Sequence, residues 1–394
     1  MNKILQYGAL AGAAALLLAG CASAADPGSA PAAESSDAPA PVAGPRLAVA
    51  YEGGVTVFGG DDLAELGDFD SEEFIRLNAA GDGRHVMVTT SKGFQLLDAR
   101  APELTELLVP AAAAGHVVSH ADKTVLYDDA TSDTTVFDSA ALAASEGELP
   151  EAEVIPGDTA HHGVSVELED GTLLTTVGTE AGRTGIRVLD ANRDEIASND
   201  QCPGVHGEGT AQGEAVVFGC EDGVLLVKDG EITKLDAPDE FGRSGNAYVS
   251  ESSPLVVMDY KTDPDAEGYL LRDLALVDTA AGTLETVALP DGVEYTYRGV
   301  GRGPAEEAVL IGTDGKLHSI DPATGEITSS LQVVDPWEGP AEWQDPHPSV
   351  KVAGDRAYVT DPADSEIVVV DLTTGEIAQT VALDHVPNEI AVIG

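Results

Sequence analysis

The sequence has 394 residues, of which 69 are Asp or Glu and only 20 are Lys or Arg, so its formal net charge is −49. This charge argues against nucleic acid and anionic membrane surfaces as partners, because both repel a strongly acidic protein. A cation remains compatible with it as a ligand. The length exceeds the usual ~150 residues of one domain, but large closed β folds exceed that value too.

Residues 1–21 have the pattern of an export signal. A lysine precedes an apolar run from Ile4 to Leu18, and small residues then lead to Cys21. This order is typical of a secretory signal peptide, and its end, Leu-Ala-Gly-Cys, resembles a bacterial lipobox in which Cys21 becomes the lipidated N-terminus. No later stretch approaches the ~18 apolar residues that span a bilayer. We therefore expect a lipoprotein of a Gram-positive host that is anchored to the outer face of the cytoplasmic membrane. Disulfides persist in that compartment.

Residues 22–45 contain Ala, Pro, Ser, Gly and acidic residues, with almost no large apolar side chain. Such a segment buries too little apolar surface to offset its ordering entropy, so it is predicted to be a disordered tether. The folded domain is then expected to span residues 46–394.

An imperfect repeat runs through this domain at a spacing of roughly 40–50 residues. Each copy is a short apolar strand, a turn rich in Asp, Gly and Thr, and a second strand. The clearest copies are IVVVDLTTGEIAQTVAL (367–383), LHSIDPATGEITSSLQV (317–333) and LALVDTAAGTLETVALP (274–290). Another pair of strands precedes each copy. The pattern predicts an all-β fold, a single eight-bladed β-propeller, with seven blades as the alternative.

The two ends of the domain are predicted to share one blade. The stretch HVPNEIAVIG (385–394) supplies a lone inner strand, and RLAVAYEGGVTVFGG (46–60) supplies the outer strands that this blade lacks. Pairing these two segments closes the ring and leaves no open sheet edge.

Histidines recur near the start of the innermost strand of several repeats. Counting back from the first turn of each repeat places this start near His116, His161 and His162, His206, Asn246, Arg298, His347 and His385. The innermost strands of a propeller line its central channel and begin at one face. These histidines should therefore converge on one mouth of the channel.

Three neighbouring repeats offer a three-histidine metal site made of His116, His206 and one or both of His161 and His162. Glu208 lies two residues after His206, so it should point to the same side of the strand, and either Glu208 or a loop carboxylate is expected to complete the ligand shell. Neutral imidazole is the commonest nitrogen ligand of zinc, which takes three or four such donors. Zinc is thus the expected ion, although Cu²⁺, Ni²⁺ and Co²⁺ also suit histidine ligands.

Two further metal positions follow from the same counting. His120, four residues after His116, could point into the channel or lie at a turn. A weaker rim site would combine His347 and His385, which lie near Asp345 and Asp384. Acidic loops on the same face are expected to raise the local cation concentration, and they contain Asp128, Asp129, Glu221, Asp222 and Asp361.

Cys202 and Cys220 bracket the stretch that contains His206. Their spacing fits no Cys-x-x-Cys redox or zinc pattern. If the hairpin turns near Gln212, the two residues lie opposite each other at its open end, and in an exported protein they are expected to form a disulfide. This disulfide would constrain the hairpin, would stabilise the fold by about 3 kcal/mol and would leave no sulfur free to bind the metal.

The stretches HHGVSVELEDG, CPGVHGEGTAQGEAVVFGC and DPHPSVKVAGDRAYVTDP resemble the AztD family of exported zinc metallochaperones, and the resemblance extends over residues 46–394. It implies a β-propeller that binds zinc and passes it to the solute-binding protein of a zinc ABC transporter, and we expect this protein to be a monomer. Members of this family can carry a mobile histidine-rich segment near the N-terminus. The tether here contains no histidine, so a flexible hand-off arm is not expected.

Two other classes of function fit the same sequence. A metal-independent propeller could bind other proteins of the cell envelope, since fold does not imply function. A metal-dependent extracellular enzyme could use Glu208 as the base for a metal-bound water. The sequence contains no Gly-x-Ser-x-Gly or His-Glu-x-x-His motif, and the expectation is therefore a protein that is not an enzyme.

Overall fold

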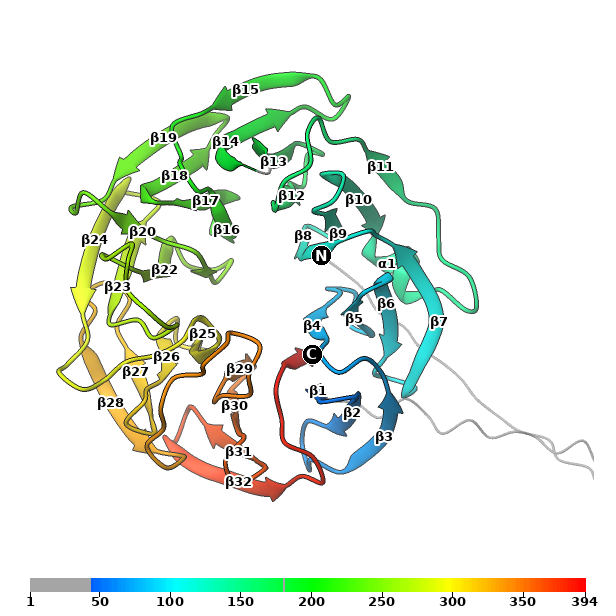
Figure 1. Cartoon of the computed structure of the whole chain (residues 1–394), viewed down its shortest axis with the longest axis vertical. Helices are drawn as coiled ribbons and strands as arrows, with labels where there is room; N and C mark the ends of the chain where they lie inside the picture. Colours follow the sequence, from blue (N-terminus) through cyan, green and yellow to red (C-terminus); the bar gives the residue numbers. More distant parts are fainter. Residues whose placement is uncertain (1–43, 180) are drawn as a thin grey trace, which may run out of the picture. The chain divides into compact units, whose positions relative to one another are not determined.

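Eight antiparallel sheets follow one another around a central channel in the computed structural model, which describes residues 44–179 and 181–394 (Figure 1). The all-β prediction with eight blades is confirmed, and the seven-bladed alternative is wrong. The predicted signal peptide, Cys21 and the tether up to residue 43 lie outside the described residues.

The first four blades, in chain order, contain the following strands. The closing blade has β33 (Ile390–Ile393), β1 (Arg46–Tyr51), β2 (Gly54–Gly59) and β3 (Glu65–Asp70). The next has β4 (Arg76–Ala79), β5 (His85–Thr90), β6 (Gly93–Asp98) and β7 (Glu103–Pro110). The third has β8 (Ala114–His120), β9 (Lys123–Asp128), β10 (Asp133–Asp138) and β11 (Glu153–Ile155). The fourth has β12 (Ser165–Glu167), β13 (Leu173–Thr179), β14 (Gly182–Leu189) and β15 (Glu195–Asn199).

The remaining blades complete the ring. The fifth has β16 (His206–Ala211), β17 (Ala215–Cys220), β18 (Asp222–Lys228) and β19 (Glu231–Asp236), and the short β20 (Gly242–Arg243) pairs with β18. The sixth has β21 (Ala247–Tyr248), β22 (Leu255–Tyr260), β23 (Asp273–Asp278) and β24 (Thr283–Ala288). The seventh has β25 (Val300–Arg302), β26 (Ala308–Ile311), β27 (Lys316–Ile320) and β28 (Ile327–Gln332). The eighth has β29 (Val350–Ala353), β30 (Arg356–Asp361), β31 (Glu366–Asp371) and β32 (Glu376–Ala382).

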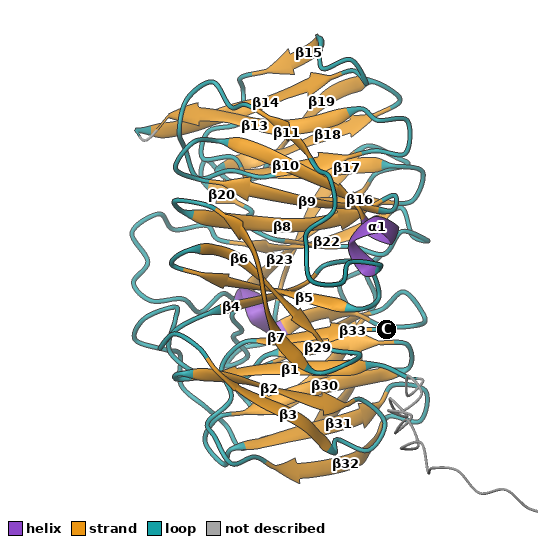
Figure 2. Ribbon diagram, turned by 90° about the vertical axis from the view of Figure 1, so that its right-hand side faces the viewer, coloured by secondary structure: helices purple, strands orange, loops and turns teal. Residues whose placement is uncertain are grey.

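Helix contributes little to the described residues. The α-helix α1 (Ser139–Ala143) follows β10, and the 3-10 helix η1 (Tyr297–Gly299) precedes β25. Figure 2 shows that strands and their connecting loops make up nearly all of the ring. Neither helix in this part of the chain is long and apolar enough to cross a lipid bilayer.

The repeated sequence explains the packing within a blade. In β31 the four apolar residues of Glu-Ile-Val-Val-Val-Asp are all buried, because a middle strand has a neighbouring blade on each face. The outermost strand β24 mixes exposed and half-buried residues. The hairpin between β31 and β32 turns at Asp371, whose carboxylate accepts the N–H of Thr373 at 2.9 Å, and at Gly375, whose φ of 70° favours glycine.

The ends of the propeller are joined as predicted. β1 pairs with β33 in an antiparallel register that runs from Arg46 opposite Ile393 to Val49 opposite Ile390. Arg100 from the neighbouring blade donates hydrogen bonds to the carbonyl oxygens of Gly44 and Gly394 and so ties down both ends. The ring therefore closes through hydrogen bonds between the first and the last strand of the domain.

Deleting residues 385–394 is expected to open this ring. The deletion leaves the edge of β1 unpaired, and it removes Ile390, Ala391 and Ile393 from the core, where each is at most 3% exposed. We expect loss of the cooperative thermal transition in circular dichroism and aggregation in size-exclusion chromatography. The matched control is Val386→Ser in the same segment, because Val386 is 46% exposed. A soluble, cooperatively folded deletion variant would contradict this mode of closure.

Candidate metal centre

Three histidines from consecutive blades meet at the channel. His116 lies in β8, His162 lies in the loop before β12, and His206 is the first residue of β16. One nitrogen from each imidazole lies within 4.8 Å of the other two. Among the described residues, this is the one group of three or more His, Cys, Asp and Glu side chains that meets such a distance limit.

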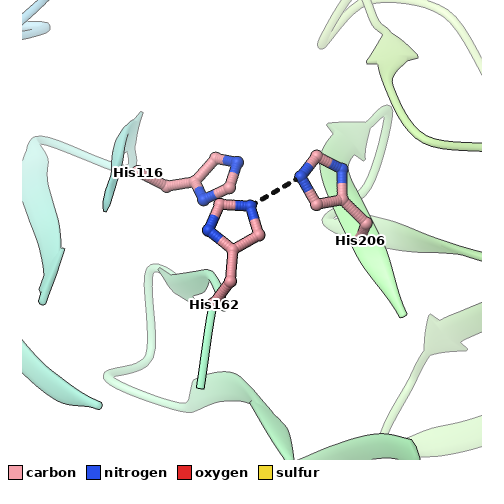
Figure 3. Close-up of side chains that lie close together, drawn as sticks. All are labelled: His116, His162 and His206. Carbon is pink, nitrogen blue, oxygen red and sulfur yellow. Dashed lines mark hydrogen bonds between the residues drawn. The ribbon is translucent and has the colours of Figure 1, made fainter. Parts of the chain in front are cut away.

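The three imidazole rings lie close together (Figure 3). Their centroids are 5.0 Å apart for His116 and His162, 5.1 Å for His116 and His206, and 5.0 Å for His162 and His206. The Nε2 atoms of His162 and His206 are 2.9 Å apart. Two lone pairs at this separation repel each other unless a proton or a metal ion lies between them.

A hydrogen bond at Nδ1 orients each of the three rings. Nδ1 of His116 donates to the carbonyl oxygen of Gly163 at 2.8 Å, and Nδ1 of His206 donates to that of Gly245 at 2.5 Å. Nδ1 of His162 donates to the carboxylate of Asp129 at 2.6 Å. Because a carbonyl or carboxylate oxygen only accepts, these bonds leave the Nε2 lone pair of each neutral ring free. Metal-ligating histidines are commonly held in this way.

The surroundings keep two imidazoles of this cluster, those of His116 and His206, uncharged. Desolvation lowers the pKa of His116 to about 4, with smaller contributions from the nearby His162 and Arg76. Desolvation also places the pKa of His206 well below its ordinary value, and His116 and His162 add to this effect. Neutral imidazole is the form that binds metal, so His116 and His206 need lose no proton near neutral pH to act as ligands.

The cluster remains accessible from the channel. The side chain of His162 is 44% exposed, and His116 and His206 are half-buried. All three border a cavity of about 840 Å³ to which every blade contributes residues. An ion held here would therefore be open to exchange, in contrast to one in a closed structural site.

Comparison with known proteins shows similarity to a zinc chaperone. The chain is 26% identical over 303 residues to the zinc chaperone AztD of Citrobacter koseri, a match that covers 76% of this chain and 70% of the relative. No family model matches the sequence. The solved structure of apo AztD from the same organism superimposes with a TM-score of 0.75 at 23% identity and covers 89% of this chain and 98% of that one.

The resemblance to AztD is confirmed. A second crystal structure of Citrobacter koseri AztD gives a TM-score of 0.73 at 23% identity over 90% of this chain and 98% of that one. The dihydro-heme d1 dehydrogenase NirN is a more distant neighbour, with a TM-score of 0.56 and 13% identity over 88% of this chain and 74% of its own. The structural likenesses establish the fold that this chain shares with AztD, and the sequence match connects it with a zinc chaperone.

The structure distinguishes between the two adjacent histidines that the sequence left open. His162 belongs to the cluster with His116 and His206, whereas His161 does not and is only 6% exposed. Both nitrogens of His161 have partners, because Nδ1 lies 2.9 Å from Oγ of Ser132 and Nε2 lies 3.0 Å from Oη of Tyr127. Successive residues of an extended chain face opposite sides, so only one of the two reaches the cluster.

Glu208 is not brought to the three histidines. The prediction assumed unbroken alternation along β16, but a β-bulge lies between His206, which is opposite Gly219, and Glu208, which is opposite Phe218. Gly207 adopts a φ of 64° at this bulge, and the bulge turns the following side chain. Desolvation raises the pKa of Glu208 to about 7, and the nearby His120 opposes this shift.

His120 also lies apart from the cluster. Four residues of strand separate it from His116, a rise of about 13 Å along the channel. Its Nδ1 lies 2.9 Å from a carboxylate oxygen of Glu251, and its Nε2 lies 3.1 Å from one of Glu214. Both ring nitrogens are thus occupied by ion-pair partners at this position.

The expected rim site of His347 and His385 is not assembled. The ring of His385 stacks on Tyr51 at a centroid distance of 3.8 Å. The ring of His347 is buried beside Trp337, and its Nδ1 donates to the carbonyl oxygen of Asp345 at 2.7 Å. Histidines from three adjacent blades therefore converge at the channel, whereas His347 and His385 do not join them.

Cys202 and Cys220 are joined by a disulfide, as the sequence predicted, with their Cα atoms 4.9 Å apart. Both residues are fully buried. The bond connects the end of β17 to the loop before β16, and the hairpin turns at residues 212–214 as expected. It thus constrains the backbone that leads into His206 and does not contribute a ligand.

The sequence analysis missed the residues that orient the cluster and the charge of the cavity. Of the five acidic loop residues expected at the mouth, only Asp129 lines the cavity, where its carboxylate binds His162. The cavity also contains five basic residues, Arg76, Arg183, Arg243, Arg298 and Lys351. No local pattern in the sequence connects these five residues, because they come from elements far apart in the chain, namely β4, β14, β20, η1 and β29.

Burial of His347 predicts a loss of stability in acid. The side chain is 3% exposed, its Nε2 has no hydrogen-bond partner, and desolvation with the positive charge of Arg298 lowers its pKa to about 4. An unfolded histidine has a pKa of about 6.5. Between these values the unfolded state binds a proton that the folded state does not, so stability is lost as the pH falls from about 6.5 to about 4.

The measurement is urea unfolding of the wild type and of His347→Phe, which keeps an aromatic ring beside Trp337. Between about pH 7 and about pH 4.5, the free energy of unfolding of the wild type should fall by about 2–3 kcal/mol more than that of the variant. Other acid-sensitive groups are common to both proteins and cancel in the comparison. The same pH dependence in both proteins would show that His347 is not the responsible group.

Proposed function

We propose that this protein is a zinc-binding metallochaperone that delivers zinc to the solute-binding protein of a zinc ABC transporter. The observation that carries the proposal is the convergence of three Nε2 lone pairs, those of His116, His162 and His206, each fixed by a bond at Nδ1. The sequence similarity to the zinc chaperone AztD supports it. In this role zinc is cargo, and the protein performs no catalysis.

The proposed site has the properties that a carrier needs. Three histidines supply fewer ligands than the four that close a structural zinc site, so a water or a donor from the receiving protein can take the remaining position. The exposed edge of His162 gives such a donor access. Desolvation keeps His116 and His206 neutral before the metal arrives, so proton competition does not oppose loading near neutral pH.

The alternatives receive less support from the structure. The enzymatic hypothesis used Glu208 as a base for a metal-bound water, but this carboxylate lies near His120 and not with the three histidines. A purely structural propeller gives no reason to collect three oriented imidazoles in an open cavity. Neither alternative has a specific feature among the described residues that favours it.

Replacing His206 with Ala should lower the zinc affinity about tenfold or more, because one of three nitrogen ligands is lost. The measurement is competition with a chromogenic zinc chelator, together with circular dichroism to verify the fold. The matched control is His385→Ala, which removes an exposed histidine that stacks on Tyr51 and lies outside the cluster. Equal affinities for wild type and His206→Ala would refute the proposed ligand set. Weakened zinc binding in His385→Ala would show that His385 contributes to zinc binding, as the rim-site prediction held.

We also propose that the protein acts on the outer face of the cell membrane, held there by a lipid on Cys21. The Leu-Ala-Gly-Cys stretch motivates this proposal. Cell fractionation and immunoblotting should find the wild type with the membranes, whereas Cys21→Ser should lose the anchor and become soluble. Equal partitioning of the two proteins would argue against lipidation at this position.

A further inference from the structure

The cavity beside the three histidines has a charge opposite to that of the whole chain. Five of the 20 Lys and Arg residues of the sequence line it, whereas only Asp129 and Glu389 of the 69 acidic residues do so. The lining therefore carries an excess of three positive charges while the histidines are neutral. In a chain with a net charge of −49, this concentration calls for a specific explanation.

Protein groups neutralise only part of this charge. Glu389 binds Arg298 at 2.8 Å and lies 3.8 Å from Arg76. By contrast, no hydrogen bond or ion pair joins the side chains of Arg183, Arg243 or Lys351 to any described residue. Desolvation lowers the pKa of Arg183, the positive charge of Arg243 lowers it further, and the carboxylates of Glu221 and Asp129 oppose these effects without a direct contact. Unpaired, partly desolvated charges of like sign destabilise a fold unless a ligand compensates them.

Two of the unpartnered cations lie next to the metal ligand His206. The carbonyl oxygen of Arg183 accepts the N–H of Gly204, two residues before His206, at 3.0 Å. The guanidinium of Arg243 lies against Gly245, where an added Cβ would be 3.0 Å from Nη1. Gly245 is the residue whose carbonyl orients His206. A ligand bound by these two arginines would therefore lie beside the three-histidine cluster.

Lys351 marks a second position in the same cavity. It comes from β29, in a blade far along the chain from β14 and β20, which carry Arg183 and Arg243. Its side chain is exposed to the cavity. Desolvation lowers the pKa of its ammonium, Arg76 and Arg298 act in the same direction, and Glu389 opposes them. The charge of Lys351 adds to the positive excess of the cavity, and this excess favours a ligand with more than one negative group.

The chemistry of these groups indicates the class of ligand. Guanidinium binds carboxylate and phosphate through paired, charge-assisted hydrogen bonds. A carboxylate also supplies oxygen ligands to zinc, so it suits a position beside three imidazoles better than an anion that serves the arginines alone. The volume of about 840 Å³ is that of a small-molecule pocket. These features favour a small organic anion with several carboxylates.

We propose that the channel cavity binds a small polycarboxylate anion, with Arg183 and Arg243 holding one of its carboxylates beside His206. This anion site goes beyond the proposed delivery of zinc, and it forms whether or not the histidines carry metal.

The experiment is isothermal titration of citrate into the zinc-free protein at low ionic strength. The metal is removed with a chelating resin and not with EDTA, because EDTA is itself a polycarboxylate. We expect binding of one citrate, weakened by salt as charge pairing requires, and no binding of the neutral trimethyl ester of citrate. Because zinc is absent, the outcome does not depend on whether the protein is a zinc chaperone.

Variants locate the site. Arg183→Gln/Arg243→Gln should bind citrate about tenfold more weakly or worse, since it loses charge-assisted hydrogen bonds. The matched control is Arg272→Gln, whose side chain is 77% exposed and pairs with Glu294 outside the cavity; it should bind as the wild type does. If the double variant does not fold, Arg183→Gln and Arg243→Gln, each made alone, provide the same test.

Several outcomes would overturn the proposal. They are absence of citrate binding to the wild type, unchanged affinity in the cavity variants, and equal binding of citrate and its ester. Binding of a tetraglutamate peptide without binding of citrate would also overturn it, because the occupant would then be an acidic protein segment.

Discussion

The backbone hydrogen bonds between β1 and β33 hold the first and the last strand of the domain in one blade. Because of this pairing, the neighbouring inner strands β29, β33 and β4 lie side by side, and the ring has no open edge there. A closed ring fixes the diameter of the channel and the angle between successive blades. The distance between side chains on different blades, such as His116 and His206, therefore depends on hydrogen bonds formed far from either residue.

The channel combines two electrostatic environments that the composition does not reveal. Burial and mutual repulsion keep His116 and His206 neutral, and the arginines nearby add to this effect. Neutral imidazoles can bind a cation even though the lining has a positive excess, because coordination bonds act at about 2 Å, whereas the charges of the lining act over longer distances. An anion that pairs with the arginines would reduce the remaining repulsion. The polar lining of the channel thus suits a metal and an anion together.

The rigidity of the centre comes from contacts outside the ligands. The carbonyl groups of Gly163 and Gly245 belong to the blade of His162 and to the segment before β21, so the bonds from His116 and His206 each reach the next blade of the ring. The disulfide between Cys202 and Cys220 constrains the loop before His206. Ligand orientation is therefore linked to the packing between blades, and a strain in one blade would be transmitted to the imidazole of its neighbour.

The sequence by itself determined the all-β propeller, the shared closing blade and the disulfide, because strand periodicity, turn residues and repeat length are local properties. It left the blade count open between eight and seven, and it brought more histidines together at the channel mouth than the structure does. It could not distinguish His162 from His161, since the direction of a side chain in an irregular loop depends on its neighbours. It also placed Glu208 with His206, because alternation along a strand fails at a bulge such as that at Gly207. Only the tertiary structure decided that His347 and His385 pack separately and that Arg183, Arg243 and Lys351 share one cavity. The physical reason is that these relations join residues of different blades, whose separations are set by the closure of the ring and leave no trace in the adjacent sequence.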